Sequence, residues 1–158
     1  MTETLPVPKQ VRDVLSDLLG RDVTVNITDP PSADAPAVAV YVRGTGMTLH
    51  GVIGFDLPLA ANAAASVGLV PPGGAAACVE DGELSPLLKD NLGEVCNILS
   101  GLFHQEGGPH VRFHKLHTPV ADVPGDVRSH LAALGSRLDL TVEIAGYGKG
   151  TMSIVAAL

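Results

Sequence analysis

Two acids and an amide recur at helical spacing in the segment DNLGEVCNILSG, residues 90–101. Asp90, Glu94, Asn97 and Gly101 are separated by four, three and four positions, which places them on one side of an α-helix. A carboxylate can accept hydrogen bonds or pair with a cation, and a side-chain amide both accepts and donates. A helix that holds these groups side by side would present a rigid acid and amide to a partner.

The opposite side of the same segment is apolar. Its hydrophobic positions are Leu84, Leu88, Val95, Leu99 and Leu102. An apolar band of this kind packs on a core and leaves the polar side exposed. We therefore predict a helix from near Leu84 to His104, with Ser85 as its cap, Pro86 in its first turn and the glycines at 107 and 108 just past its end.

Hydrophobic periodicity predicts the remaining elements. Helical patterns occupy residues 8–19, 57–68 and 124–134, and strand patterns occupy 23–27, 37–42, 47–55, 109–117, 138–144 and 152–158. Turn residues at 43–46 and 146–150 predict two hairpins, and the Val-Pro-Pro-Gly-Gly run at 70–74 ends any helix before it. Short turns between neighbouring strands favour antiparallel pairing. We expect an α+β fold in which helices pack on a mainly antiparallel sheet.

Composition limits what such a chain can do. Its 158 residues, 46% of them hydrophobic, fit one globular domain spanning residues 1–158. A net charge of −7 and only five aromatic residues argue against nucleic acid as a partner. The first residues lack a basic-then-apolar signal, and polar residues interrupt the apolar run at 57–70, so we expect a cytoplasmic protein with no membrane partner. Cys78 and Cys96 lack redox spacing, and we expect reduced structural thiols.

Four histidines, His104, His110, His114 and His117, follow the predicted polar helix. On a strand His110 and His114 would share one face and His117 would point to the other, and no carboxylate or cysteine stands at zinc-like spacing. We therefore predict no metal site. A cation near a helix C-terminus is the simpler account of His104.

Two catalytic motifs can be set aside. The glycine-rich residues 146–151 lack the order of a phosphate-binding P-loop and precede a strand, so a hairpin turn is the better interpretation. The sequence also contains no Gly-x-Ser-x-Gly elbow, which leaves a serine hydrolase without support.

The spacing of Asp90, Glu94 and Asn97, with a later proline at Pro119, resembles the phosphatase signature of the CheC/CheX/FliY chemotaxis family. The segment VIGFD at 52–56 and the alanine-rich helix after it agree with this family in order and spacing, most of all with its CheX branch. The resemblance spans most of the chain. Pro119 falls slightly early for the family pattern, and Leu-Phe-His follows Gly101 where small or amide residues are common.

This resemblance implies that the protein removes the phosphoryl group from the aspartyl phosphate of a CheY-type receiver domain. Glu94 and Asn97 would be catalytic, with Asn97 orienting the attacking water and Glu94 engaging the receiver, while Asp90 and Gly101 would contact the partner. The protein would need no cofactor of its own, because the phosphorylated receiver supplies Mg²⁺. Hydrolysis of an acyl phosphate passes through a loose transition state, so positioning suffices without a strong base.

The resemblance also implies the number of sites and the oligomeric state. CheC and FliY carry two signatures and CheX carries one. The helix predicted at 57–68 contains Asn62 but no acid at the corresponding earlier position, which implies one site per chain. The similarity to CheX implies a homodimer. The alternative function is a catalytically inactive dimeric adaptor, which would use the same helix to bind a receiver or a signalling complex without accelerating phosphate loss.

Overall fold

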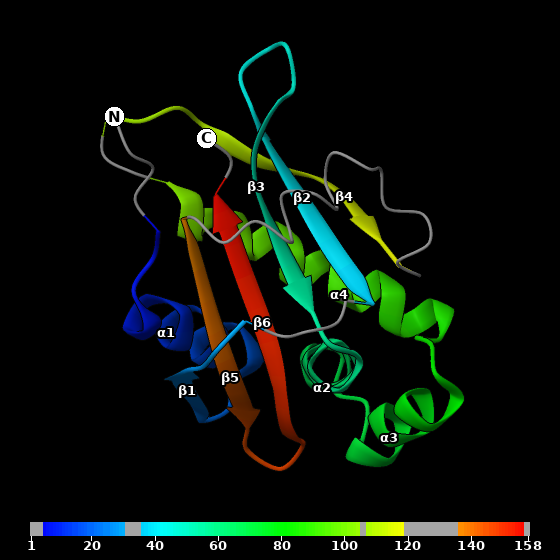
Figure 1. Ribbon diagram of the computed structural model, residues 1–158. Helices are drawn as coiled ribbons and strands as arrows, with labels where there is room; N and C mark the ends of the chain where they lie inside the picture. Colours follow the sequence, from blue (N-terminus) through cyan, green and yellow to red (C-terminus); the bar gives the residue numbers. More distant parts are fainter. Residues whose placement is uncertain (1–4, 31–35, 105–106, 119–135, 157–158) are drawn as a thin grey trace.

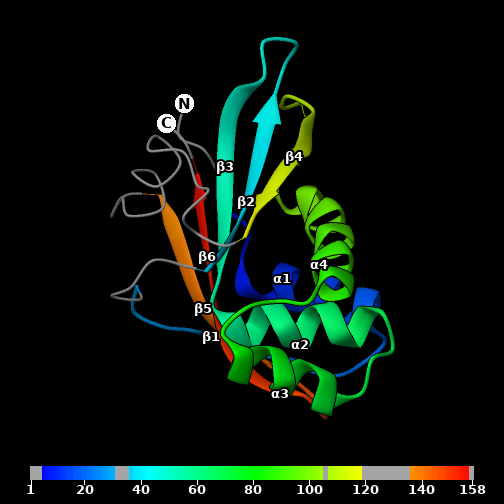
Figure 2. The ribbon, with the colours of Figure 1, turned by 90° about the vertical axis from the view of Figure 1, so that its right-hand side faces the viewer.

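The computed structural model describes residues 5–30, 36–104, 107–118 and 136–156. Within these residues the helices lie together on one face of a single sheet (Figures 1 and 2). The helices are α1 (Pro8–Leu19), α2 (Leu57–Val67), α3 (Pro72–Asp81), α4 (Pro86–Leu99) and the 3-10 helix η1 (Ser100–Phe103). The strands are β1 (Val23–Ile27), β2 (Ala37–Arg43), β3 (Thr48–Phe55), β4 (Val111–His117), β5 (Arg137–Ile144) and β6 (Gly148–Ala156).

The sheet is antiparallel at every pairing and has the order β1-β5-β6-β3-β2-β4. Two hairpins, β2–β3 and β5–β6, meet where β3 pairs with β6. The edge strand β4 comes from a later part of the chain and pairs with β2. The α+β fold expected from the sequence, with helices packed on an antiparallel sheet, is confirmed.

Asp56 fixes α2 to the centre of the sheet. Its Oδ1 accepts a hydrogen bond of 2.9 Å from the Leu59 N–H and so caps the helix, while its Oδ2 accepts bonds of 2.9 Å from both the N–H and the hydroxyl of Thr151 on β6. Gly150 lets the two elements meet, because a Cβ there would lie 2.5 Å from the Leu59 nitrogen. The position of α2 matters for the site, because α2 packs against α4.

The structure refines one predicted helix and adds another. The helix predicted from near Leu84 to His104 begins at Pro86 as α4, with Ser85 as its cap as expected, and its last turn tightens into η1. Helix α3 was not predicted at all, because its Pro-Gly-Gly start has the composition of a loop. Proline is well suited to a first helical turn, and burial of Ala75 and Cys78 favours the helix.

Some expectations fall outside the described residues. These are Pro119 of the signature, the helix predicted at 124–134 and the end of the strand predicted at 152–158. Of the helices described in the other ranges, none is both long and apolar enough to cross a membrane.

Candidate functional site on helix α4

Helix α4 is fixed on the core by its apolar side, as the sequence predicted. Leu88, Leu92, Val95 and Leu99 are at most 2% exposed, and the flanking Leu84 and Leu102 are also buried. At the N-terminus Ser85 Oγ accepts a hydrogen bond of 3.3 Å from the Leu88 N–H, and Pro86 occupies the first turn. The start of the helix is therefore well defined.

The end of α4 is tied to the sheet by a buried tyrosine. The hydroxyl of Tyr41, on β2, donates a hydrogen bond of 2.6 Å to the backbone carbonyl of Cys96. The last carbonyls of a helix have no partner within it, and Tyr41 satisfies one of them. Burial, and then the proximity of Cys96, raises the pKa of the Tyr41 hydroxyl well above its ordinary value, so the group stays a donor.

A third contact fixes α4 sideways. The Asn91 side-chain amide donates a hydrogen bond of 3.1 Å to the carbonyl of Ala64 on α2. Gly68 leaves room for this amide, because an added Cβ would clash with it. Together with the two contacts at its ends, this bond limits both rotation and sliding of α4.

The structure brings the predicted site residues together on the exposed side of this helix. Asp90, Glu94, Asn97 and Gly101 are all exposed. Within the described ranges, no hydrogen bond or ion pair is found for the side chains of Asp90, Glu94 or Asn97. Glu94 and Asn97 are three positions apart on a helix, a spacing that puts Cβ atoms about 5–6 Å apart. An acid and an amide thus face the surroundings side by side.

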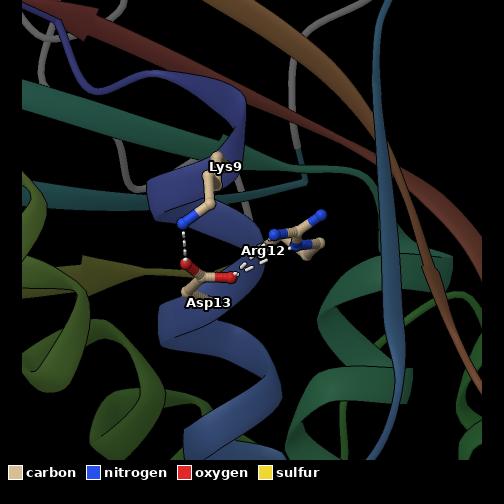
Figure 3. Close-up of polar contacts among 3 residues, drawn as sticks. All are labelled: Lys9, Arg12 and Asp13. Atoms are coloured by element: carbon tan, nitrogen blue, oxygen red, sulfur yellow. Dashed lines mark hydrogen bonds and ion pairs between the residues drawn. The ribbon is translucent and has the colours of Figure 1, made fainter.

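Two acids in the described part of the chain, Asp13 and Asp139, are paired with cations of the chain itself. On α1, Asp13 lies 3.1 Å from Lys9 Nζ and 3.1 Å from an Arg12 guanidinium nitrogen (Figure 3). The hydrogen bond from Lys9, followed by that from Arg12, lowers the pKa of Asp13. Asp90 and Glu94 have no such cation among the described residues, so they can pair with a cation that a partner brings.

Two apolar side chains on the same exposed side of α4 were missed by the sequence analysis. Leu87 is 59% exposed and Ile98 is 50% exposed. In the sequence both are simply hydrophobic residues of an amphipathic helix. Their helical phase beside Glu94, rather than with the buried leucines, is the signal that could have identified them.

Asn62, on α2, is the residue that the family resemblance compares with Asn97. Its side chain is 8% exposed and lies near Gly148 at the start of β6, and Leu59, three positions earlier, is 1% exposed. This side of α2 is therefore covered by the chain itself.

The histidines do not assemble into a site in the described part of the chain. His104 Nε2 lies 2.9 Å from the Val111 carbonyl, and the rings of His104 and His110 are 5.3 Å apart between centroids. His117 is buried. The described residues contain no group of three or more histidines, cysteines or acids that could hold a metal ion.

Two smaller expectations can be checked as well. The glycine-rich segment after Ile144 forms the β5–β6 hairpin, in which Ile144 pairs with Gly148, as predicted. Cys78 and Cys96 are both free and buried, in keeping with structural thiols. Burial raises the pKa of the Cys96 thiol, which keeps it protonated and unreactive.

Comparison with known proteins gives a match only at the level of structure. No protein-family model and no curated protein sequence matches the chain. FliM in the FliM–SpeE complex from H. pylori matches with a TM-score of 0.63 and 12% identity, over 94% of this chain and 80% of that one. CheX in the CheX–CheY–BeF₃–Mg²⁺ complex from Borrelia burgdorferi matches with a TM-score of 0.52 and 14% identity, over 92% of each chain. A chemotactic CheC-like protein from Shewanella oneidensis matches with a TM-score of 0.53 and 14% identity, over 95% of each chain.

Proposed function

We propose, on the premise that the chain has the CheC/CheX/FliY fold, that it removes the phosphoryl group from the aspartyl phosphate of a CheY-type receiver domain. One observation carries the proposal: Glu94 and Asn97 are exposed side by side on a helix that is fixed at both ends and from one side. The CheX of similar fold is itself recorded in a complex with CheY, BeF₃ and Mg²⁺.

Asn97 is assigned to the attacking water. Its side-chain oxygen accepts a hydrogen bond from the water, and its amide N–H donates one to a phosphoryl oxygen. The oxygen of the water bonds to phosphorus as the bond between phosphorus and the aspartyl oxygen breaks. The aspartate side chain of the receiver is regenerated as a carboxylate, and both protons of the water leave with inorganic phosphate. Because the transition state is loose, alignment of the water is the main contribution that the protein has to make.

Glu94 is assigned to the receiver. Its unpaired carboxylate pairs with the cationic lysine of the receiver and so fixes the approach of the aspartyl phosphate to Asn97. The receiver also supplies the Mg²⁺ that neutralises charge on the phosphoryl group. The part of α4 that faces outward carries acids and no cation of its own, so the phosphoryl group must arrive already neutralised.

The anchoring of α4 supports a catalytic role for this face. A displacement of roughly 1 Å can lower the rate of such a reaction about 10²-fold. The bonds from Tyr41, Ser85 and Asn91 hold α4 against rotation and translation. A surface that only had to bind a partner would need less restraint.

The FliM match supports a second candidate, since FliM is recorded in a complex with SpeE. The chain would then be a dimeric adaptor that binds a receiver or a signalling complex through α4 and performs no chemistry. The phosphatase and the adaptor would bind a receiver through the same surface of α4, but only the phosphatase would accelerate loss of the receiver's phosphoryl group.

The test is to mix the protein with each phosphorylated receiver domain of the same organism, with Mg²⁺ and after chelation, and to follow phosphate release in a single turnover. A phosphatase accelerates release beyond the receiver's own decay in at least one mixture. An adaptor binds a beryllofluoride-charged receiver and leaves the decay rate unchanged.

A further inference from the structure

Leu87 and Ile98 expose apolar surface that the fold does not use. They are 59% and 50% exposed, although the neighbouring leucines of α4 at positions 88, 92 and 99 are at most 2% exposed. Single exposed hydrophobic residues are ordinary on protein surfaces. Here two of them share one helix and one side of it, which calls for a common reason.

Their position relates them to the proposed site. At 100° per residue, Leu87 and Ile98 project within roughly 40° of Glu94, on the side of Glu94 away from Asn97. Along the helix they lie about 16 Å apart, one on each side of Glu94. One exposed apolar side chain therefore lies before Glu94 along the helix and one after it.

Two glycines leave the backbone beside Asn97 without side chains. Gly93 and Gly101 lie one helical turn before and after it, and neither has a positive φ. A Cβ added at either glycine would meet nothing within 4 Å, so packing among the described residues does not require glycine there. Glycine inside a helix is unfavourable relative to alanine, and close approach of another molecule is a physical reason to keep it.

The charges of this face define what could cover it. Asp90 and Glu94 are exposed and unpaired in the described part of the chain, and Lys89, the cation of α4, projects away from them. A complementary surface therefore presents a cation opposite Glu94 and apolar groups on both sides of that cation. A free small acyl phosphate offers neither, whereas a folded receiver with its lysine and Mg²⁺ can offer both.

We infer that Leu87 and Ile98 are the apolar anchors by which α4 docks on the receiver domain, and that they determine which receivers are bound. This inference rests on the proposed function and names the partner surface for the same site: apolar side chains flanking the lysine near the phosphorylated aspartate. Glu94 and Asn97 then act on a phosphoryl group whose position the two anchors have set.

The test measures binding apart from turnover. Receiver domains of the same organism, charged with beryllofluoride and Mg²⁺, are titrated with the wild-type protein and with Leu87→Gln, Ile98→Gln and the double variant. We expect each single change to raise Kd about tenfold and the double change about a hundredfold. With phosphorylated receiver, KM rises in the same proportion and kcat at saturation is unchanged.

Leu69→Gln is the matched control, because Leu69 is 84% exposed and lies between α2 and α3. Its Kd should equal that of the wild type, and thermal unfolding should show that all variants fold. A double variant that binds within twofold of wild type overturns the inference, as does a wild-type protein that binds none of the receivers. If the wild-type protein binds and the double variant does not, but phosphate release is never accelerated, the docking surface stands and the phosphatase proposal fails.

Discussion

The hydroxyl of Tyr41 lies 2.6 Å from the carbonyl oxygen of Cys96, one residue before Asn97. The ring of Tyr41 packs against two others, with centroid distances of 4.8 Å to Phe103 and 5.8 Å to Phe113. Through this hydrogen bond the sheet fixes the position of the C-terminal end of α4 and, with it, the position of Asn97.

Removing this hydroxyl should affect both stability and chemistry. Tyr41→Phe leaves the buried Cys96 carbonyl without its partner and should lower the free energy of unfolding by about 1–3 kcal/mol, measured in urea. We expect kcat to fall several-fold, because Asn97 loses its restraint. Tyr147→Phe is the control: it loses an equally short 2.6 Å bond, to the Val70 carbonyl away from α4, and should cost stability alone. Equal kcat values for the two variants would refute the positioning role of Tyr41.

The proposed function predicts that Asn97→Ala abolishes most of the phosphatase activity and leaves binding nearly unchanged. Loss of one group that acts mainly in the transition state lowers kcat by about 10²–10³-fold. Single-turnover decay of the phosphorylated receiver measures the loss, and titration of the beryllofluoride-charged receiver measures the binding. Asn26→Ala, which removes an exposed amide on β1, is the control. Decay as fast with Asn97→Ala as with the wild type would disprove the assignment.

Glu94→Gln should act mainly on docking. A charged hydrogen bond to the receiver's lysine is worth about 1.5–3 kcal/mol, so KM should rise by roughly one to two orders of magnitude. The effect should shrink as salt is added, since screening already weakens the pair in the wild type. Glu80→Gln, on the exposed part of α3, should behave as wild type. A Glu94→Gln variant with normal KM would remove this residue from the interface.

Gly93→Ala should raise stability while lowering activity. Nothing within 4 Å opposes the added methyl group, and helix propensity favours alanine by about 0.5–1 kcal/mol, which is measurable as a higher Tm. The methyl group lies beside Asn97 and should hinder the receiver, so kcat/KM should fall. Gly73→Ala, at an equally open position in α3, should gain stability without losing activity. Full activity in Gly93→Ala would mean that the bare backbone has no role.

Acid should weaken the fold through Asp139 on β5. Its carboxylate pairs at 2.8 Å with two nitrogens of Arg137 and accepts a 2.7 Å bond from Ser153. Burial alone raises the pKa of Asp139, but the bonds from Arg137 and then Ser153 outweigh it and lower the pKa below 3.8. Because the pKa of this carboxyl is higher in the unfolded chain, the unfolded chain binds the proton more readily than the folded one. The contribution of Asp139 to stability is therefore complete above pH 3.8 and is lost as the pH falls through the pKa of the folded protein.

The measurement is urea unfolding of wild type and Asp139→Asn across this range. At neutral pH the variant should be about 1–3 kcal/mol less stable, because it replaces the charged acceptor of two 2.8 Å bonds from Arg137 by a neutral amide. The difference should narrow as the pH drops below 3.8. Asp13→Asn, in the exposed cluster of α1, provides the control for an ion pair in solvent. A difference in unfolding free energy between wild type and Asp139→Asn that stays constant with pH would contradict the role given to Asp139.

Local patterns in the sequence predicted much of this molecule. The range 8–19 coincides with α1, and the apolar band from Leu84 to Leu102 and the polar stripe opposite it were both recognised. Periodicity reports such features because it depends on neighbouring positions alone. Helix α3 was missed because proline and glycine begin it, and tertiary packing overrides their low propensity.

What the sequence could not predict depends on distant contacts. The bond from Tyr41 to Cys96 joins residues 55 positions apart, and only the β2 register places the tyrosine beneath α4. Exposure of Leu87 and Ile98 likewise depends on how α4 is rotated against the core, which Asn91 and Tyr41 settle. The residue type alone does not separate a core position from a docking position, and only the helical phase relative to the buried leucines distinguishes Leu87 and Ile98.

The strand order has a consequence for synthesis of the protein. Tyr41 belongs to the β2–β3 hairpin, and β3 is completed only by β6, more than ninety positions further along the chain. Pairing of segments so far apart in sequence is slow and cannot start before both exist. A ribosome-bound chain that already contains all of α4 therefore still lacks the central β3–β6 pairing of its sheet, which can form only after Gly148–Ala156 has emerged from the exit tunnel.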